Sequence, residues 1–341
     1  MNGQNRRKGY VALSMTAAIF GLSFLFTKNA LDHLEIFPLL GFRFLTAALF
    51  LTGLRLLRIL RIRVPREHLG KILLVALFQP ILYFTFETIG VSLTTSSQSS
   101  VMISLIPVAV LIFSHFMLGE RLLPAQMAAA GISMAGVLII VAVGAGDGGQ
   151  GHLMGVLALL LAVAAGGLFN PMSRRISPVA SPLTITYVMM WAGALVFTAA
   201  GLIQAGLAGT LGSYLEPLGI TRVRLELGYL GILSSGVAFF LFNYGLARVE
   251  ASRSAIFLNL VPVVSIWAGV VFRNESFSGL QVLGALLILT GIFALDNPRW
   301  LALWHRDRRE AVVPSLKDSV VPGANDTENN PQEDWTWTNR Y

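Results

Sequence analysis

Ten long apolar segments follow one another along the chain, and they constrain its fold more than any other feature. Each holds roughly the 20 predominantly apolar residues that an α-helix needs to cross a bilayer. In hydrocarbon, every backbone N–H and C=O has to be paired within its own segment, so we expect helices. The sequence therefore predicts an all-α polytopic membrane protein with ten transmembrane helices. Their predicted bounds are 10–31, 37–58, 71–91, 97–118, 124–144, 153–173, 182–206, 226–247, 252–272 and 279–297.

The composition agrees with a bilayer as the main solvent. Charged residues make up only 13% of the chain, against about 25% in soluble domains. This excludes a soluble multidomain enzyme and a disordered chain. There is no cysteine, which excludes disulfides and thiolate metal sites. The five histidines have no metal-ligand spacing, and no P-loop is present. We therefore expect no cofactor and no metal.

The basic residues predict the orientation. With a cytoplasmic N-terminus, 20 of the 25 lysines and arginines fall on the cytoplasmic side, as the positive-inside rule requires. This predicts a multi-pass protein of the cell inner membrane with both termini cytoplasmic. The basic run 55–66 becomes a loop beside anionic lipid headgroups, so no nucleic-acid partner is expected. Residues 1–9 form the cytoplasmic N-terminus, and 298–341 a largely disordered tail.

An internal repeat relates the two halves of the chain. A shift of 155 residues places 84–136 on 239–291 with 11 identities in 53 positions. Pro107 then meets Pro262, and Glu120 meets Glu275. Each unit, 10–144 and 153–297, holds five spans, an odd number, so the second is expected to be inverted. Many secondary transporters have this architecture, with the substrate site near the midplane between the repeats.

Several short motifs resemble the EamA family of the drug/metabolite transporter superfamily. They are Phe20-Gly21, Phe42-Arg43-Phe44, Pro107-Val108 through Gly119-Glu120-Arg121, Pro262-Val263 through Asn274-Glu275, and 283–291. The resemblance covers roughly residues 9–297. It implies ten spans, cytoplasmic termini and export of small metabolites by alternating access. Asn274 stands where the family has Gly before the second Glu.

Two ionisable residues inside spans are the first candidates for a solute site. An ionisable group in hydrocarbon is costly and is a functional hypothesis by default. Arg43 and Glu87 have similar depths in antiparallel spans, so we expect a pair or a shared water network in the outer half of a cavity. The alternatives are a structural pair, or an arginine that extends toward the interface. Glu87 is also a candidate for proton coupling.

Other residues have both a functional and a structural interpretation. Tyr83, Trp191, Asn243 and Asn259 are candidate cavity-lining residues, although aromatic packing and hydrogen bonds between helices are alternatives. Pro107 and Pro262 are predicted to kink the fourth and ninth spans. Lys28 is expected to extend to the interface. Glu120 and Glu275 are expected to be structural, near the positive end of the helix that follows each.

Together these features predict a secondary transporter that exports a small organic metabolite through a central cavity between the repeats. Arg43 and Lys28 against a single Glu87 favour an amino-acid-like solute. The expected partners are this solute and the lipid bilayer. Alternatives are an exporter of cationic drugs, and a membrane receptor or scaffold that acts through its tail. A membrane-embedded enzyme would need a cluster of catalytic groups within the spans, which the sequence lacks.

Overall fold

The protein is helical throughout the part of the chain that can be described. The computed structural model describes residues 3–62, 64–118, 124–176, 179–246 and 260–296, and no strand occurs within these ranges. Eight helical stretches there are long and apolar enough to cross a membrane, and two shorter apolar helices follow. The predicted tail 298–341 lies outside the described residues, and the arrangement as ten helices in two inverted repeats stays a prediction.

The first half begins with two uninterrupted helices, and its next two spans are built from several pieces. The third predicted span contains the π-helical segment η2, in which Gln79 departs from helical geometry (φ −143°, ψ 114°). The elements are α1 (Gly3–Ala30), α2 (Ile36–Leu56), η1 (Arg66–His68), α3 (Leu69–Ala76), η2 (Leu77–Leu82), α4 (Tyr83–Leu93), α5 (Ser96–Ile103) and α6 (Ile106–Leu118).

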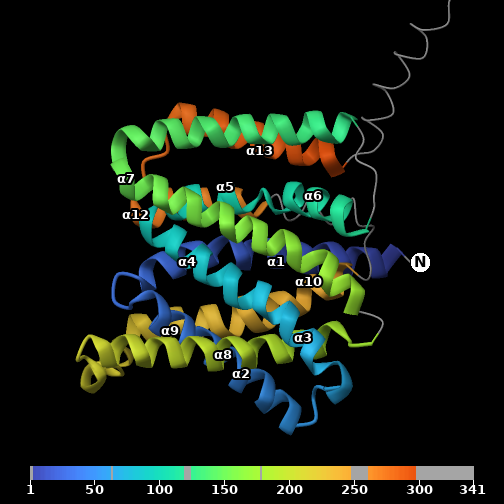
Figure 1. Cartoon of the computed structure of the whole chain (residues 1–341), viewed down its shortest axis with the longest axis vertical. Coiled ribbons are helices and arrows are strands. Elements are labelled where there is room, and N and C mark those ends of the chain that lie inside the picture. Colours follow the sequence, from blue (N-terminus) through green and yellow to red (C-terminus); the bar gives the residue numbers. More distant parts are fainter. Residues whose placement is uncertain (1–2, 63, 119–123, 177–178, 247–259, 297–341) are drawn as a thin grey trace, which may run out of the picture. The chain divides into compact units, whose positions relative to one another are not determined.

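Two predicted spans share one long helix. α7 (Pro124–Ile176) contains the candidate spans Pro124–Val143 and Gln150–Ser173, and its ribbon turns back on itself between them (Figure 1). Residues 145–152, which connect the two predicted spans, are thus part of α7. The remaining elements are α8 (Pro182–Leu207), η3 (Leu211–Ser213), η4 (Glu216–Gly219), α9 (Thr221–Gly228), the π-helical η5 (Tyr229–Ala238), α10 (Phe239–Leu246), α12 (Leu260–Arg273) and α13 (Gly279–Asp296).

The two predicted kinks lie near helix starts. Ser104 and Leu105 separate α5 from α6, and Pro107 is the second residue of α6. Proline has no N–H to donate to the preceding turn, which is consistent with a break at this point. Pro262 is the third residue of α12 and is buried. The beginning of the predicted ninth span, 252–259, lies outside the described residues.

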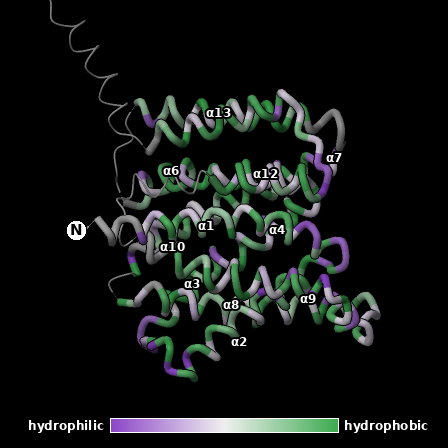
Figure 2. Tube along the Cα trace, turned by 180° about the vertical axis from the view of Figure 1, so that it is seen from behind, coloured by the Kyte–Doolittle hydropathy of each residue, from purple (hydrophilic) through white to green (hydrophobic). Residues whose placement is uncertain are grey.

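The helices pack in pairs that join distant parts of the sequence. α2 packs against α8, the first half of α7 against α13, and α1 against α12 and α10. Glycines allow the α7–α13 approach, because a Cβ on Gly284 would lie 2.8 Å from the carbonyl oxygen of Gly136. Hydrophobic residues dominate the helices, and hydrophilic residues gather in the connections at the ends (Figure 2). We call the end that carries the α1–α2 connection the 31–35 end.

Candidate functional site

Arg43 is buried in the middle of the helices, with only 2% of its surface exposed. Its Nε donates to Ser235 Oγ at 3.2 Å and its Nη2 to Ser234 Oγ at 3.3 Å, both in η5. The guanidinium carbon lies 4.5 Å from the ring centroid of Phe84 in α4, a cation–π contact. Nη1 is buried and has no hydrogen-bond partner within the described ranges. Arg43 thus keeps the N–H donors of Nη1 available for an acceptor on a ligand.

Glu87 lies one turn beyond Phe84 on α4 and is also buried, with 4% of its surface exposed. Among the described residues it makes no ion pair with Arg43, and its Oε2 has no partner. The predicted direct pair is therefore absent here. Arg43 instead directs Nε and Nη2 to the two serines and lies over the ring of Phe84. The site holds opposite charges that are both incompletely satisfied, which is costly in a medium of low dielectric constant.

Aromatic rings surround these two charges. The ring of Tyr83 packs edge-on against Phe84 with a centroid distance of 4.8 Å. Phe44, next to Arg43 in α2, packs against Phe84 at 5.0 Å. A Cβ on Gly193 of α8 would lie 2.9 Å from the ring of Phe44. The absence of a side chain at Gly193 therefore lets α8 approach α2 beside the site.

Trp191 lies away from Arg43. Its Nε1 donates to Thr52 Oγ1 at 3.1 Å, and Thr52 also shares a hydrogen bond of 3.3 Å with the Tyr187 hydroxyl. Thr52 follows Arg43 by nine residues, or about 13 Å along a helix axis. The indole N–H of Trp191 therefore bonds α8 to α2 about two to three helical turns away from Arg43.

The two predicted amides cannot be placed. The backbone of Asn243 is in α10, but its side chain lies outside the described part of the chain, as does the whole of Asn259. Sequence reasoning also missed Ser234, Ser235 and Phe84 as partners of Arg43. The adjacent serines inside an apolar span were the available signal.

Lys28 is a helix-capping residue. Its Nζ donates to three backbone carbonyls at the end of α4: Val91 at 2.7 Å, Ser92 at 2.9 Å and Thr94 at 2.6 Å. The extension of Lys28 to the interface stays a prediction, and what the structure adds is that its ammonium group binds the negative end of α4. All three ammonium protons are used, so Lys28 has no donor left for a solute.

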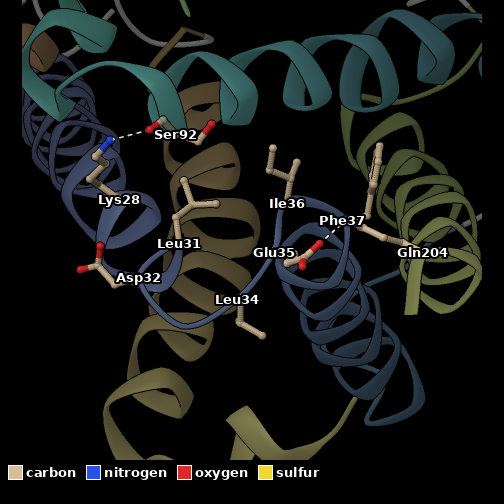
Figure 3. Close-up of a pocket in the computed structure, with 9 residues that line it drawn as sticks. All are labelled: Lys28, Leu31, Asp32, Leu34, Glu35, Ile36, Phe37, Ser92 and Gln204. Atoms are coloured by element: carbon tan, nitrogen blue, oxygen red, sulfur yellow. Dashed lines mark hydrogen bonds between the residues drawn. The ribbon is translucent and has the colours of Figure 1, made fainter. Parts of the chain in front are cut away.

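A pocket of about 360 Å³ lies beside Lys28 at the 31–35 end. Figure 3 shows Leu31 and Ile36 on its wall, Asp32 at its side and Glu35 hydrogen-bonded to Gln204 of α8. The remaining lining residues are Leu34, Phe37 and Ser92. The pocket has an apolar wall and a polar rim.

Glu275 contacts a different helix from the one predicted. Its carboxylate accepts four hydrogen bonds from Ser96 and Ser97, the first residues of α5. We expected it to face the start of the helix that follows it, α13. The reason for the difference is Asn274, whose left-handed backbone (φ +51°) ends α12 and turns the chain toward α5. Asparagine tolerates this conformation better than most residues with a side chain. Glu120, its counterpart in the repeat, lies outside the described residues.

The family model and the similar proteins agree on one family of transporters. The EamA-like transporter family matches residues 7–142 and 153–295. The chain is 33% identical to the uncharacterized transporter YcxC of Bacillus subtilis strain 168 over 83% of this chain and 91% of that protein. It is 28% identical to a "probable amino-acid metabolite efflux pump" of Escherichia coli K12, covering 85% and 94% of the two chains.

Two further matches support the same conclusion. A "probable terminal-alkyne amino-acid exporter" of Streptantibioticus cattleyicolor is 27% identical over 65% of this chain and 69% of its own length. A crystal structure with 19% identity superposes with a TM-score of 0.59 over 86% of this chain and 98% of its own chain, which shows a shared fold. The chain therefore belongs to the EamA-like transporter family of the drug/metabolite transporter superfamily.

Proposed function

We propose that the protein is a secondary exporter of a small amino-acid-like solute, and that Arg43 and Glu87 bind the two charged ends of this solute. One observation carries the proposal: Arg43 Nη1 and Glu87 Oε2 are both buried within candidate membrane spans, and neither has a partner among the residues that the structure describes. A carboxylate on the solute would accept from Arg43, and an ammonium group would donate to Glu87. Transport would follow alternating access through a central cavity between two inverted repeats, with both termini cytoplasmic.

The contacts of Lys28 and the aromatic rings near Arg43 indicate which residues would recognise each part of such a solute. Lys28 is bonded to α4, so in the described part of the chain we assign recognition of the carboxylate to Arg43. Tyr83 and Phe84 offer aromatic surface beside the charges, which suits a small apolar side chain on the solute. The names of two relatives refer to amino-acid metabolites or amino acids, and this agrees with the proposal.

A test of the proposal uses one amino acid and two of its analogues. The purified full chain is titrated with L-leucine, with the amine that lacks the carboxylate, and with the acid that lacks the amino group. We expect only leucine to raise the unfolding midpoint, since a ligand of the folded state stabilises it by mass action. Loss of one buried charge contact should weaken binding at least about tenfold.

Two variants then assign the contacts. Arg43→Gln should bind leucine and the amine with equal affinity, because the carboxylate has lost its partner. Glu87→Gln should bind leucine and the acid with equal affinity, because the ammonium group has lost its partner. Lys71→Gln, at an exposed position, is the matched control and should bind as the unmodified chain does. Equal binding of all three compounds, or an unchanged preference in Arg43→Gln, would refute the assignment. Other amino acids follow in the same format.

Glu87 is also proposed to couple transport to protons. A buried carboxylate without a partner can alternate between protonation and an ammonium ligand. In proteoliposomes, Glu87→Gln should still exchange labelled solute at concentrations above its weakened Kd but should lose the acceleration of efflux by a proton gradient. If Glu87→Gln responds to the gradient as the unmodified chain does, coupling through this residue is wrong.

A second candidate function is export of cationic drugs. A carboxylate beside Tyr83 and Phe84 can also bind an organic cation, because ring faces attract positive charge. The same titration decides between the two functions: a cationic drug would bind Arg43→Gln at least as tightly as the unmodified chain, since Arg43 repels it.

A further inference from the structure

Two neighbouring contacts link α12 to the first half of the chain at the 31–35 end. The first is made by Arg273, the last residue of α12. Its Nη1 donates to Asn29 Oδ1 at 2.7 Å and to Asp32 Oδ2 at 2.8 Å, and its Nη2 to Asp32 Oδ1 at 3.3 Å. We call this the Arg273 contact. It joins α12 to the end of α1.

The second contact is made by Glu275, two residues later. Oε1 accepts from the N–H and the hydroxyl of Ser96, both at 2.8 Å, and Oε2 from those of Ser97 at 3.0 and 2.6 Å. Ser265 of α12 adds a bond of 3.1 Å to the Ser96 carbonyl. Gly269 leaves room for the carboxylate, since a Cβ there would lie 2.5 Å from Ser97 Oγ. We call this the Glu275 contact.

The two contacts differ in burial and therefore in strength. Ser96 and Ser97 are completely buried, and charge-assisted hydrogen bonds to backbone N–H groups are strong. In the Arg273 contact, 46% of the Asp32 side chain and 22% of the Arg273 side chain are exposed. Exposed ion pairs contribute little to stability because water competes for both partners. The Arg273 contact can therefore open while the Glu275 contact holds.

Neighbouring contacts restrict where this end of the bundle can open. Lys28 fixes α1 to α4 through three carbonyls. α2 is bonded to α8 near both of its ends, by Glu35 to Gln204 and by Thr52 to Trp191. α1 and α12 pack against each other, and at the 31–35 end the exposed Arg273 contact joins them. Asp32 also borders the pocket of Figure 3, so the Arg273 contact lies next to this pocket.

We propose that the Glu275 contact is a fixed joint and that the Arg273 contact is a releasable closure of this end of the transport path. In each cycle α12 would turn about Glu275 while Arg273 leaves and rejoins Asp32. The proposal rests on the alternating access proposed above. The two can fail separately, because opening can be measured without any solute.

The absence of cysteine in the chain makes site-specific labelling direct. Spin labels at His33→Cys and Ser276→Cys, both exposed positions, flank the Arg273 contact and leave its residues intact. In nanodiscs we expect two distance populations by double electron–electron resonance. Asp32→Asn on this background should increase the longer-distance population at least about threefold. The control pair, Leu56→Cys and Val179→Cys near the junction of α2 and α8, should give one distance that Asp32→Asn does not change.

A cross-linking experiment adds a functional arm. The Asp32→Cys/Arg273→Cys double variant should lose efflux of labelled leucine when oxidised and regain it in reductant. One unchanged distance with and without Asp32→Asn, or full efflux by the oxidised variant, would overturn the closure. Two distances without leucine efflux in the reduced or unmodified chain would instead support the closure and refute the proposed solute.

Discussion

Glu275 and Ser96 lie 179 positions apart in sequence, and one carboxylate oxygen of Glu275 accepts both the N–H and the hydroxyl of Ser96 at 2.8 Å. Ser96 begins α5, so the carboxylate lies at a positive helix end, where unpaired N–H groups need an acceptor. This single side chain connects the two regions matched by the family.

Glu275→Ala should destabilise the protein by roughly 3 kcal/mol, because four buried donors on Ser96 and Ser97 lose their acceptor. Thermal unfolding of the purified chain in detergent measures the effect. Glu216→Ala, at an exposed position, is the control and should change stability by less than about 0.5 kcal/mol. Equal midpoints for the two variants would contradict the importance of the contact.

Gly269→Ala should also destabilise the protein, by about 1–3 kcal/mol. The new Cβ would collide with Ser97 Oγ and the Glu275 carboxylate, so α12 would have to move away from α5. Gly131→Ala in α7 is the comparison, since no atom lies within 4 Å of a Cβ there. That variant should be neutral or stabilising by up to about 1 kcal/mol. The unfolding midpoint should therefore fall in Gly269→Ala and stay unchanged or rise in Gly131→Ala.

Lys28→Met should lower stability by about 2–4 kcal/mol, because the last carbonyls of α4 lose a charged donor. Binding of the solute at Arg43 should not change, since Lys28 has no donor left for it. Parallel measurement of unfolding midpoint and solute affinity separates the two effects, with Lys71→Met as control. A large loss of affinity in a folded Lys28→Met protein would place Lys28 in the solute site.

The Arg273 contact should be insensitive to pH in the neutral range. Hydrogen bonds from Arg273 lower the pKa of Asp32 below its ordinary value of 3.8. A carboxylate with a lowered pKa contributes its stability above the unfolded pKa and loses it as the pH falls through the folded pKa. The small difference in stability between the unmodified chain and Asp32→Asn should therefore stay constant from about pH 5 to 8 and shrink below about pH 4. A difference that changes near pH 6–7 would implicate another titrating group.

The position of the helices was largely predictable from sequence, because apolar length is a local property. All eight candidate spans overlap predicted segments. Departures occur where backbone geometry depends on particular residues, as at Gln79 in η2 and at Ser104 before Pro107. An average over 20 apolar residues carries no information on such local changes.

The partners of the polar residues were less predictable. Arg43 and Glu87 were singled out by their charge, but the serines that hold Arg43 come from η5, 191 and 192 positions later. For Lys28, the sequence did not predict the three carbonyl partners at the end of α4. Hydropathy gives the depth of a side chain, while its partner depends on which helices become neighbours. The sequence of a single segment does not say which helices will be its neighbours.

The glycine contact between α7 and α13 bears on how the protein is assembled during synthesis. Gly136 is made early, but the helix that covers it contains Gly284 and is the last apolar helix described. Until α13 is inserted, the small-residue face of α7 is exposed to lipid or to the insertion machinery. A chain that stops before residue 279 would keep this face uncovered, so the close packing of α7 depends on the insertion of α13.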